Sequence, residues 1–108
     1  MTREITLKDG RKLPGLGMGT WYMGDHPERE AEEIEAVRAG INAGVSLIDT
    51  AEMYGSGRSE RLVGKAIKNQ PREELFLVSK VLPGNAGRRN IFKSLDNTLN
   101  RLGTDYLD

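Results

Sequence analysis

The sequence predicts an α/β protein in which a parallel sheet is covered by helices. Short apolar runs alternate with longer segments that carry apolar residues at helical spacing, and this alternation occurs three times in 108 residues. Regular βα alternation requires a parallel sheet, because each helix returns the chain to the edge from which the last strand began. The pattern alone leaves two architectures open, a doubly wound open sheet and a (β/α)8 barrel.

The length suits a single folding unit over residues 1–108, or part of one. Sixteen basic and sixteen acidic residues give a formal net charge of zero, which argues against a nucleic-acid partner. Cysteine is absent, so a metal site would need His26 and carboxylates alone, and none is expected. No apolar run suggests a signal peptide or a membrane span, so we expect a cytoplasmic protein without a membrane partner.

A β-hairpin and a strand are predicted first. Ile5 and Leu7 alternate with polar residues, and Asp9-Gly10 forms a turn pair before Leu13. Residues 16–18 are predicted to form the first parallel strand. The glycines at 15, 17 and 19 lack the Gly-x-Gly-x-x-Gly spacing of a dinucleotide-binding open sheet. They are therefore only weak evidence for such a sheet.

The first helix is predicted to be capped by Asp25 or His26, with Pro27 in its first turn and Gly44 after its end. Acidic residues in its first turn suit the positive end of a helix. Its predicted apolar face consists of Ala31, Ile34, Val37 and Ile41.

Two further βα units and part of another follow. Strands are predicted at residues 45–48 and 75–79, and residues 106–108 look like the start of a further strand. Ser59 is expected to cap the second helix, which ends before Pro71, and Gly103 is expected to stop the third. The predicted apolar faces are Leu62, Val63, Ala66 and Ile67 in the second helix, and Ile91, Leu95, Leu99 and Leu102 in the third.

Polar and aromatic residues stand where the predicted strands end. Thr20 and Trp21 follow the first strand, Asp49 ends the second, Lys80 ends the third, and Tyr54 lies just after Asp49. In a parallel βα fold these ends share one rim, and consecutive strands are usually neighbours. We therefore expect Asp49 and Lys80 to lie side by side.

This pattern allows two interpretations. Asp49 and Lys80 could form a structural salt bridge at the rim, and Trp21 could have only a packing role. Alternatively, Lys80 stabilises the ionised form of Tyr54, which makes that phenol a stronger acid, while Asp49 holds Lys80 in place. Such a phenol suits carbonyl reduction, in which a developing alkoxide must receive a proton.

The sequence resembles the aldo-keto reductases, and particularly their bacterial members, over essentially its whole length. The matching motifs are Gly17-Met18-Gly19-Thr20-Trp21, Leu47-Ile48-Asp49-Thr50-Ala51-Glu52-Met53-Tyr54-Gly55, Ser59-Glu60, Leu77-Val78-Ser79-Lys80-Val81 and Leu102-Gly103-Thr104-Asp105-Tyr106-Leu107-Asp108. The resemblance implies the N-terminal part of a (β/α)8 barrel, with a hairpin closing its bottom, and an oxidoreductase that uses NADPH to reduce small aldehydes or ketones.

The resemblance also implies roles for individual residues. Asp49, Tyr54 and Lys80 match three members of a catalytic tetrad of Asp, Tyr, Lys and His, and Tyr54 also meets the substrate. Gly19, Thr20 and Trp21 match a segment that contacts the cofactor and lines the substrate pocket. Within it, Trp21 also matches a residue that contacts the substrate. The family residue that Asp49 matches also lies close to the nicotinamide ribose, so the resemblance implies a cofactor contact for Asp49.

The sequence lacks the remaining part of the family pattern, because it ends at Asp108. The tetrad histidine would follow the next strand, and His26, in the first βα loop, does not match it. A complete barrel takes about 250 residues. We therefore expect a truncated barrel whose open edges favour self-association. A fragment of a longer reductase, a half-barrel that assembles with itself and a deliberately shortened version all remain open, as does a catalytically silent structural module.

Overall fold

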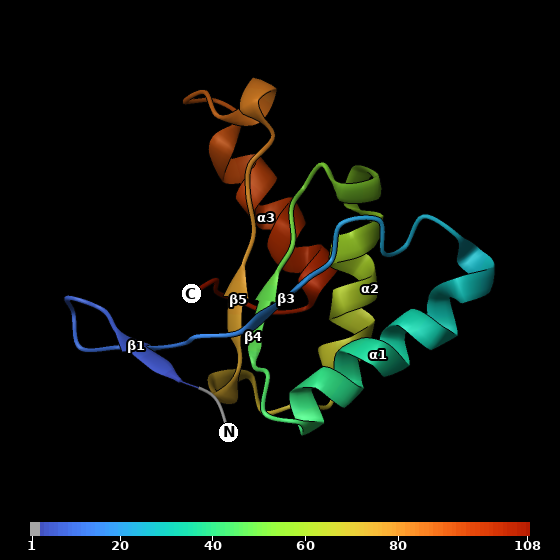
Figure 1. The fold of residues 1–108 in the computed structure, drawn as a ribbon. Helices are drawn as coiled ribbons and strands as arrows, with labels where there is room; N and C mark the ends of the chain where they lie inside the picture. The colour runs from blue at the N-terminus through green and yellow to red at the C-terminus, as the bar shows by residue number, and fades with distance from the viewer. Residues whose placement is uncertain (1–2) are drawn as a thin grey trace.

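A three-stranded parallel sheet forms the centre of the fold in the computed structural model, which describes residues 3–108 (Figure 1). The elements in chain order are β1 (Glu4–Thr6), β2 (Lys12–Pro14), β3 (Gly17–Gly19), α1 (Glu30–Asn42), β4 (Leu47–Asp49), α2 (Arg58–Ile67), β5 (Phe76–Val78) and α3 (Ile91–Leu102). Short 3-10 helices lie at Pro27–Arg29, Tyr54–Gly57, Arg72–Glu74 and Pro83–Asn85. The predicted βα order is confirmed.

The sheet has the order β3-β4-β5, so strands adjacent in the chain are also adjacent in space. Met18 pairs with Ile48, and Ile48 pairs with Leu77, in a register that ends all three strands at the same edge. Asp49 faces Gly19 on one side and Val78 on the other. The register thus brings the predicted rim residues together.

One apolar core joins the sheet to the helices. Ile48 and Leu77 supply its sheet side and are at most 1% exposed. Helix α2 packs against both α1 and α3 and lies between them (Figure 1). The fully or almost fully buried helix residues include Val37 from α1, Val63 from α2 and Leu102 from α3.

Helix α1 differs from its prediction at its beginning. His26 occupies the cap position of the preceding 3-10 helix without a side-chain hydrogen bond, and Asp25 instead pairs with Arg58. Ala31 is exposed, so its place on the predicted apolar face was wrong. Val37 is fully buried, whereas Ile34 and Ile41 are partly buried against the core. Gly44 follows the helix end with φ +96°, as a helix stop requires.

Helix α2 has the predicted apolar face but not the predicted cap. All four of its predicted core residues are buried. Gly57, with φ +94°, takes the cap position, and Ser59 is already inside the helix. The buried Ser59 hydroxyl bonds the backbone oxygens of Thr20, at 3.0 Å, and Met23. Ser59 therefore connects α2 to the loop after β3.

The predicted apolar face of α3 is only partly buried. Leu102 is 1% exposed, but Ile91 and Leu95 are 38% and 42% exposed, and the buried positions in the middle of the helix are Ser94 and Thr98. The two apolar side chains line a hollow with residues 79–81, the segment that follows β5. The outer edge of β5 carries no further strand within residues 3–108. Gly103 ends the helix with φ +70°, as predicted.

Residues 106–108 do not form the predicted strand. They run beside β5, where the Asp108 amide donates to Leu77 O at 3.0 Å and the Asp108 carboxylate accepts from the Leu77 amide at 3.0 Å. Arg72 pairs with the same carboxylate at 2.9 Å. This segment follows the edge of β5 through a single backbone hydrogen bond and a side-chain contact.

The hairpin β1-β2 is confirmed, with Ile5 opposite Leu13. It projects from the rest of the molecule near the beginnings of the parallel strands (Figure 1). The Arg11 guanidinium lies 5.9 Å from the centre of the Phe76 ring and donates to Asp108 O at 3.3 Å. The hairpin therefore lies at the end of the sheet opposite to the predicted site.

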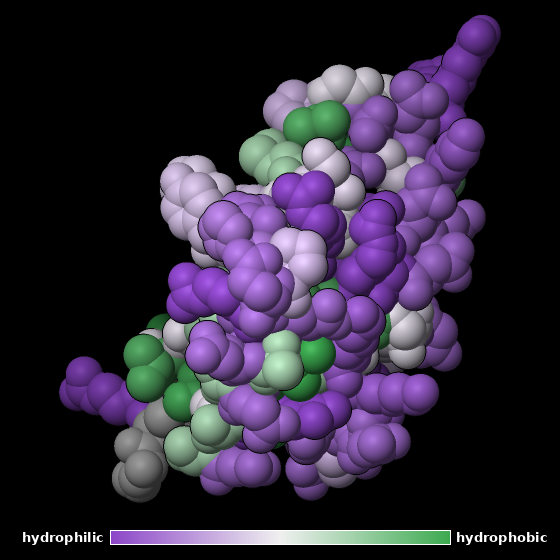
Figure 2. Space-filling model, turned by 90° about the vertical axis from the view of Figure 1, so that its right-hand side faces the viewer, coloured by the Kyte–Doolittle hydropathy of each residue, from purple (hydrophilic) through white to green (hydrophobic). Residues whose placement is uncertain are grey.

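Figure 2 shows that polar side chains cover most of one face of the molecule, with small apolar patches between them. Within residues 3–108, no helix combines the length and the hydrophobicity needed to cross a membrane.

Candidate active site

Three polar side chains meet where the parallel strands end. Asp49 is the last residue of β4, Lys80 stands two residues after β5, and Tyr54 begins the short helix between β4 and α2. The backbone holds these segments together, since the Thr50 amide donates to Val78 O at 2.9 Å and the Glu52 amide donates to Lys80 O at 3.1 Å. Backbone hydrogen bonding between the neighbouring segments thus continues beyond the strands. It holds Asp49, Tyr54 and Lys80 close together.

The Lys80 ammonium is the centre of this cluster. Its Nζ atom donates to both Asp49 carboxylate oxygens at 2.9 Å, to Thr50 O at 2.9 Å and to Tyr54 Oη at 3.2 Å. An ammonium has only three N–H donors, so the two Asp49 oxygens share the bonding. Asp49 and Tyr54 are therefore linked through one cation.

Lys80 remains strongly basic in this environment. Burial acts to lower its pKa, but hydrogen bonds to Asp49 and Tyr54 and the charge of Asp49 outweigh that effect, so the pKa of Lys80 rises above its ordinary value of 10.5. The ammonium is consequently retained across the neutral range.

Aromatic rings form the open side of the cluster. Tyr54 is stacked with Trp21, with centroids 6.0 Å apart and planes inclined by 15°. The Lys80 Nζ atom lies 4.9 Å from the centre of the Tyr54 ring. Trp21 is 65% exposed, so its ring forms an accessible wall beside the Tyr54 ring.

The segment after β3 combines one buried and one open position. Thr20 is fully buried, and both its amide and its hydroxyl donate to Asp49 O, at 3.1 and 3.0 Å. Gly19 is exposed, and a Cβ added there would meet nothing within 4 Å. Thr20 therefore fixes the backbone of Asp49, while the surface beside Gly19 is open.

Glycine-dependent backbone geometry places Tyr54. Gly55, Ser56 and Gly57 all have positive φ, of 57°, 52° and 94°. These conformations allow the chain to reverse between the end of β4 and the first turn of α2. The Tyr54 hydroxyl is thereby directed at the Lys80 ammonium.

Two carboxylates near the site were missed by the sequence analysis. Glu52 accepts from the Leu82 amide at 2.7 Å and from Asn85 at 3.2 Å, which ties the loop after β5 to the loop after β4. The Leu82 hydrogen bond is the main reason why the pKa of Glu52 falls below its ordinary value of 4.5. Its position within the Asp-Thr-Ala-Glu run was the only available signal.

The second missed carboxylate, Glu60, is fully buried. It accepts from Arg101 Nε and from Ser79 Oγ, each at 2.6 Å. Ser79 directly precedes Lys80, so this network connects α2 and α3 to the end of β5. The Ser59-Glu60 motif marked the residue, but its spacing gave no indication of burial.

His26 does not join the cluster. Its side chain is 63% exposed, and its imidazole lies 3.7 Å from Glu28. It belongs to a separate surface hollow with Gly24, Pro27 and Arg58. Within the described range 3–108, no group of three His, Asp or Glu side chains converges in a way that could hold a metal ion.

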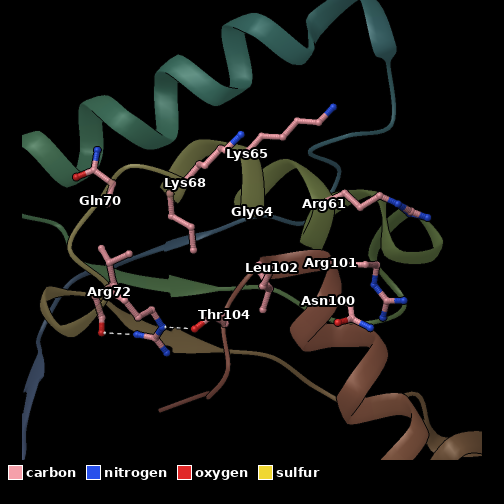
Figure 3. Close-up of a pocket in the computed structure, with 13 residues that line it drawn as sticks. Arg61, Gly64, Lys65, Lys68, Gln70, Arg72, Asn100, Arg101, Leu102 and Thr104 are labelled. Atoms are coloured by element: carbon pink, nitrogen blue, oxygen red, sulfur yellow. Dashed lines mark hydrogen bonds between the residues drawn. The ribbon is translucent and has the colours of Figure 1, made fainter.

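A large pocket lies between α2 and α3, away from the cluster. It has a volume of about 650 Å³. Figure 3 shows its basic side chains, several of which already have partners. Arg72 donates to Thr104 and to Leu75 O, and Arg101 pairs with Glu60. Asp49, Tyr54 and Lys80 do not line it.

The fold and the cluster define a parallel βα protein whose polar site lies at the carboxyl ends of the strands. The model of the aldo/keto reductase family matches residues 15–108. The chain belongs to the aldo-keto reductase family.

Related proteins support this assignment. Methylglyoxal reductase YeaE of Escherichia coli is 51% identical over 106 residues, which cover 98% of this chain and 37% of the relative. Aldo-keto reductase YhdN of Bacillus subtilis is 40% identical over 111 residues, covering 92% of this chain and 34% of the relative.

Solved structures agree with the fold. An aldo/keto reductase from Klebsiella pneumoniae, in complex with NADP and acetate, has a TM-score of 0.92 and 44% identity, covering all of this chain and 38% of the other. The chain therefore corresponds to part of a (β/α)8 barrel and spans a little over a third of the length of these relatives.

Proposed function

We propose that this chain contributes the strand-end part of the active site of an enzyme that reduces small aldehydes or ketones with NADPH. The observation that carries the proposal is the Lys80 ammonium, bonded at once to Tyr54 Oη at 3.2 Å and to both oxygens of Asp49 at 2.9 Å. A structural salt bridge would need no phenol at the accessible side of the lysine.

Tyr54 is the proposed general acid. Its hydroxyl proton would pass to the carbonyl oxygen of the substrate as negative charge develops there. The Lys80 ammonium stabilises the phenolate that remains, because the opposite charge lies within hydrogen-bonding distance. Asp49 keeps that ammonium charged and fixed, and Thr20 fixes Asp49 through its backbone oxygen.

The residues present fit a nicotinamide cofactor. Space beside the exposed Gly19 is open, which allows an extended ligand to lie against the backbone after β3. A carboxylate offers about four lone-pair sites, so Asp49 can accept a ribose hydroxyl in addition to its bonds with Lys80. When bound, the cofactor supplies hydride. Gly19, Thr20, Trp21 and Asp49 are the proposed contacts.

Small carbonyl compounds are the proposed substrates. The relative from Escherichia coli is named a methylglyoxal reductase, and methylglyoxal is therefore a reasonable first substrate to assay. Trp21 and Tyr54 would contact it, because their stacked rings border the proton-donating hydroxyl.

The test is NADPH consumption with methylglyoxal, measured for the protein and for Tyr54→Phe. We expect the variant to lower kcat by a factor of about 100 to 10,000, as loss of a general acid does. Tyr106→Phe is the matched control, because the Tyr106 ring stacks beneath Arg72 and remains in that variant. Equal activity in all three proteins would refute the role of Tyr54.

A catalytically silent structural module is the second candidate. The partly exposed Ile91 and Leu95 favour it, because an apolar surface of this kind suits association. A folded sample of this chain that shows neither NADPH binding nor turnover would support this candidate. Turnover that depends on Tyr54 would exclude it.

A further inference from the structure

Tyr22 has a backbone conformation that tyrosine rarely adopts. Its φ is +74°, and the Met23 amide donates to Thr20 O at 3.0 Å across the turn that contains it. The third position of such a turn favours glycine, which has no Cβ. A bulky residue there is strained, and strain of this kind clusters at functional sites.

Burial does not compensate for the strain. Tyr22 is 65% exposed, as is its neighbour Trp21. Instead the Tyr22 ring stacks on Trp21, with centroids 4.9 Å apart and planes within 6° of parallel. The contact holds two large apolar side chains at the surface, where each would otherwise rotate among several rotamers.

The stack leads directly to the candidate site. Trp21 is itself stacked with Tyr54, at 6.0 Å and 15°, so three nearly parallel rings end at the hydroxyl that contacts Lys80. A Trp21 ring fixed in this orientation presents an exposed, flat aromatic surface beside the ring of the proton donor. A freely rotating indole would not.

We propose that Tyr22 is a positioning residue, which holds the Trp21 indole parallel to Tyr54 and so gives the site a preference for flat carbonyl compounds, such as aromatic aldehydes, over non-planar aliphatic ones. This preference rests on the proposed function, whereas the positioning of Trp21 does not. No residue role in the sequence analysis included Tyr22.

The first test measures the orientation of Trp21 without any activity. Trp21 is the one tryptophan in the sequence, so the tryptophan emission reports that ring alone. We compare Tyr22→Gly, which removes the ring and relieves the backbone, with Tyr22→Phe, which keeps the ring. Tyr22→Gly should at least double acrylamide quenching and leave the melting temperature unchanged or higher, while Tyr22→Phe should match the parent protein. Identical quenching in Tyr22→Gly and the parent would overturn the positioning role.

The second test measures the preference by ligand-observed NMR, with benzaldehyde and propanal as probes that require no turnover. Tyr22→Gly should weaken benzaldehyde binding about fivefold or more and change propanal binding less than twofold, with Tyr22→Phe restoring the parent values. An equal change for both probes, or no benzaldehyde binding by the parent, would overturn the preference.

In the NADPH assay, the Tyr22→Gly variant should raise KM for benzaldehyde more than it lowers kcat. Absence of turnover in the parent would count against the proposed function, while the quenching result would remain valid.

Discussion

At the residue scale, the state of the site depends on the charge of Lys80. A pKa raised above 10.5 means that the folded protein binds this proton more strongly than the unfolded chain does. The associated stability is fully present below pH 10.5 and is lost as the pH rises through the higher value. Because the Lys80 side chain is 46% exposed, solvent screens much of this effect. Around neutral pH, Lys80 thus contributes a constant ammonium.

Glu52 gives a pH prediction of the opposite sign. Its pKa is lowered from 4.5, so its stabilising effect is present above pH 4.5 and is lost as the pH falls through the lower folded value. Glu52→Gln should therefore flatten part of the acid limb of the stability curve and cost about 1 kcal/mol at neutral pH, the typical worth of a hydrogen bond.

The measurement for Glu52 is urea unfolding between pH 3 and pH 7, compared with the parent. The exposed Glu28→Gln serves as the control. An unchanged pH dependence in Glu52→Gln would show that the link to Leu82 does not contribute to stability.

The sequence was sufficient to identify those site residues whose positions are set by the pairing of the strands. Asp49 and Lys80 end neighbouring strands, and parallel pairing brings such ends together whatever the side chains around them. Tyr22 and Glu60 could not be found in this way. The role of Tyr22 depends on a single φ angle, and that of Glu60 depends on which side chains of α3 and β5 approach it.

At the element scale, the contact between α2 and α3 depends on Gly64. A Cβ at Gly64 would lie 2.3 Å from Arg101 O, a backbone atom that moves only with its helix. Gly64→Ala should destabilise the protein by about 1–3 kcal/mol, the range for overpacking, although alanine is the better helix former.

Gly40 in α1 provides the matched control for Gly64. A Cβ there would meet Met18 Sδ at 2.1 Å, but this atom belongs to a flexible side chain that can move away. Gly40→Ala should therefore change stability by less than about 1 kcal/mol. Thermal unfolding of both variants checks the pair, and a larger loss in Gly40→Ala than in Gly64→Ala would contradict the explanation.

Glu60 links α2, α3 and β5 through charged hydrogen bonds. Removing one partner of a buried ion pair leaves the other charge uncompensated, so Glu60→Ala should cost about 3–5 kcal/mol. Glu60→Gln, which keeps a similar shape, should cost less. Chemical denaturation measures both, with the exposed Glu73→Ala as control. A loss in Glu60→Ala below that in Glu73→Ala would show that the network is not stabilising.

The element boundaries show why caps were predicted less well than faces. The four apolar positions of α2 follow from periodicity, and all are buried. Ser59 has the right type for a cap, but the positive φ of Gly57 starts the helix earlier, and Ser59 instead bonds the loop after β3. Tertiary contacts decide between these local alternatives, and single-sequence patterns do not contain them.

At the scale of the whole molecule, the helices cover the sheet unevenly. Helix α2 lies between its neighbours and has the most buried residues, whereas α3 leaves Ile91 and Leu95 partly exposed. These two side chains join Val81, Leu107 and Lys80 around a hollow of about 240 Å³ beside the segment that follows β5. The hollow is predominantly apolar, and it adjoins the candidate site through Lys80.

This hollow predicts association of the 108-residue chain when it is prepared alone. A partly exposed apolar surface favours association with another chain, because the contact removes apolar area from water. Sedimentation equilibrium should show mass above that of a monomer, increasing with protein concentration. Leu95→Lys should reduce the association without unfolding the chain, because Leu95 is already 42% exposed. Asn97→Lys adds the same charge at another exposed position of α3 and should have little effect. A chain that remains monomeric at every concentration, or an equal effect of the two lysines, would show that this surface does not drive association.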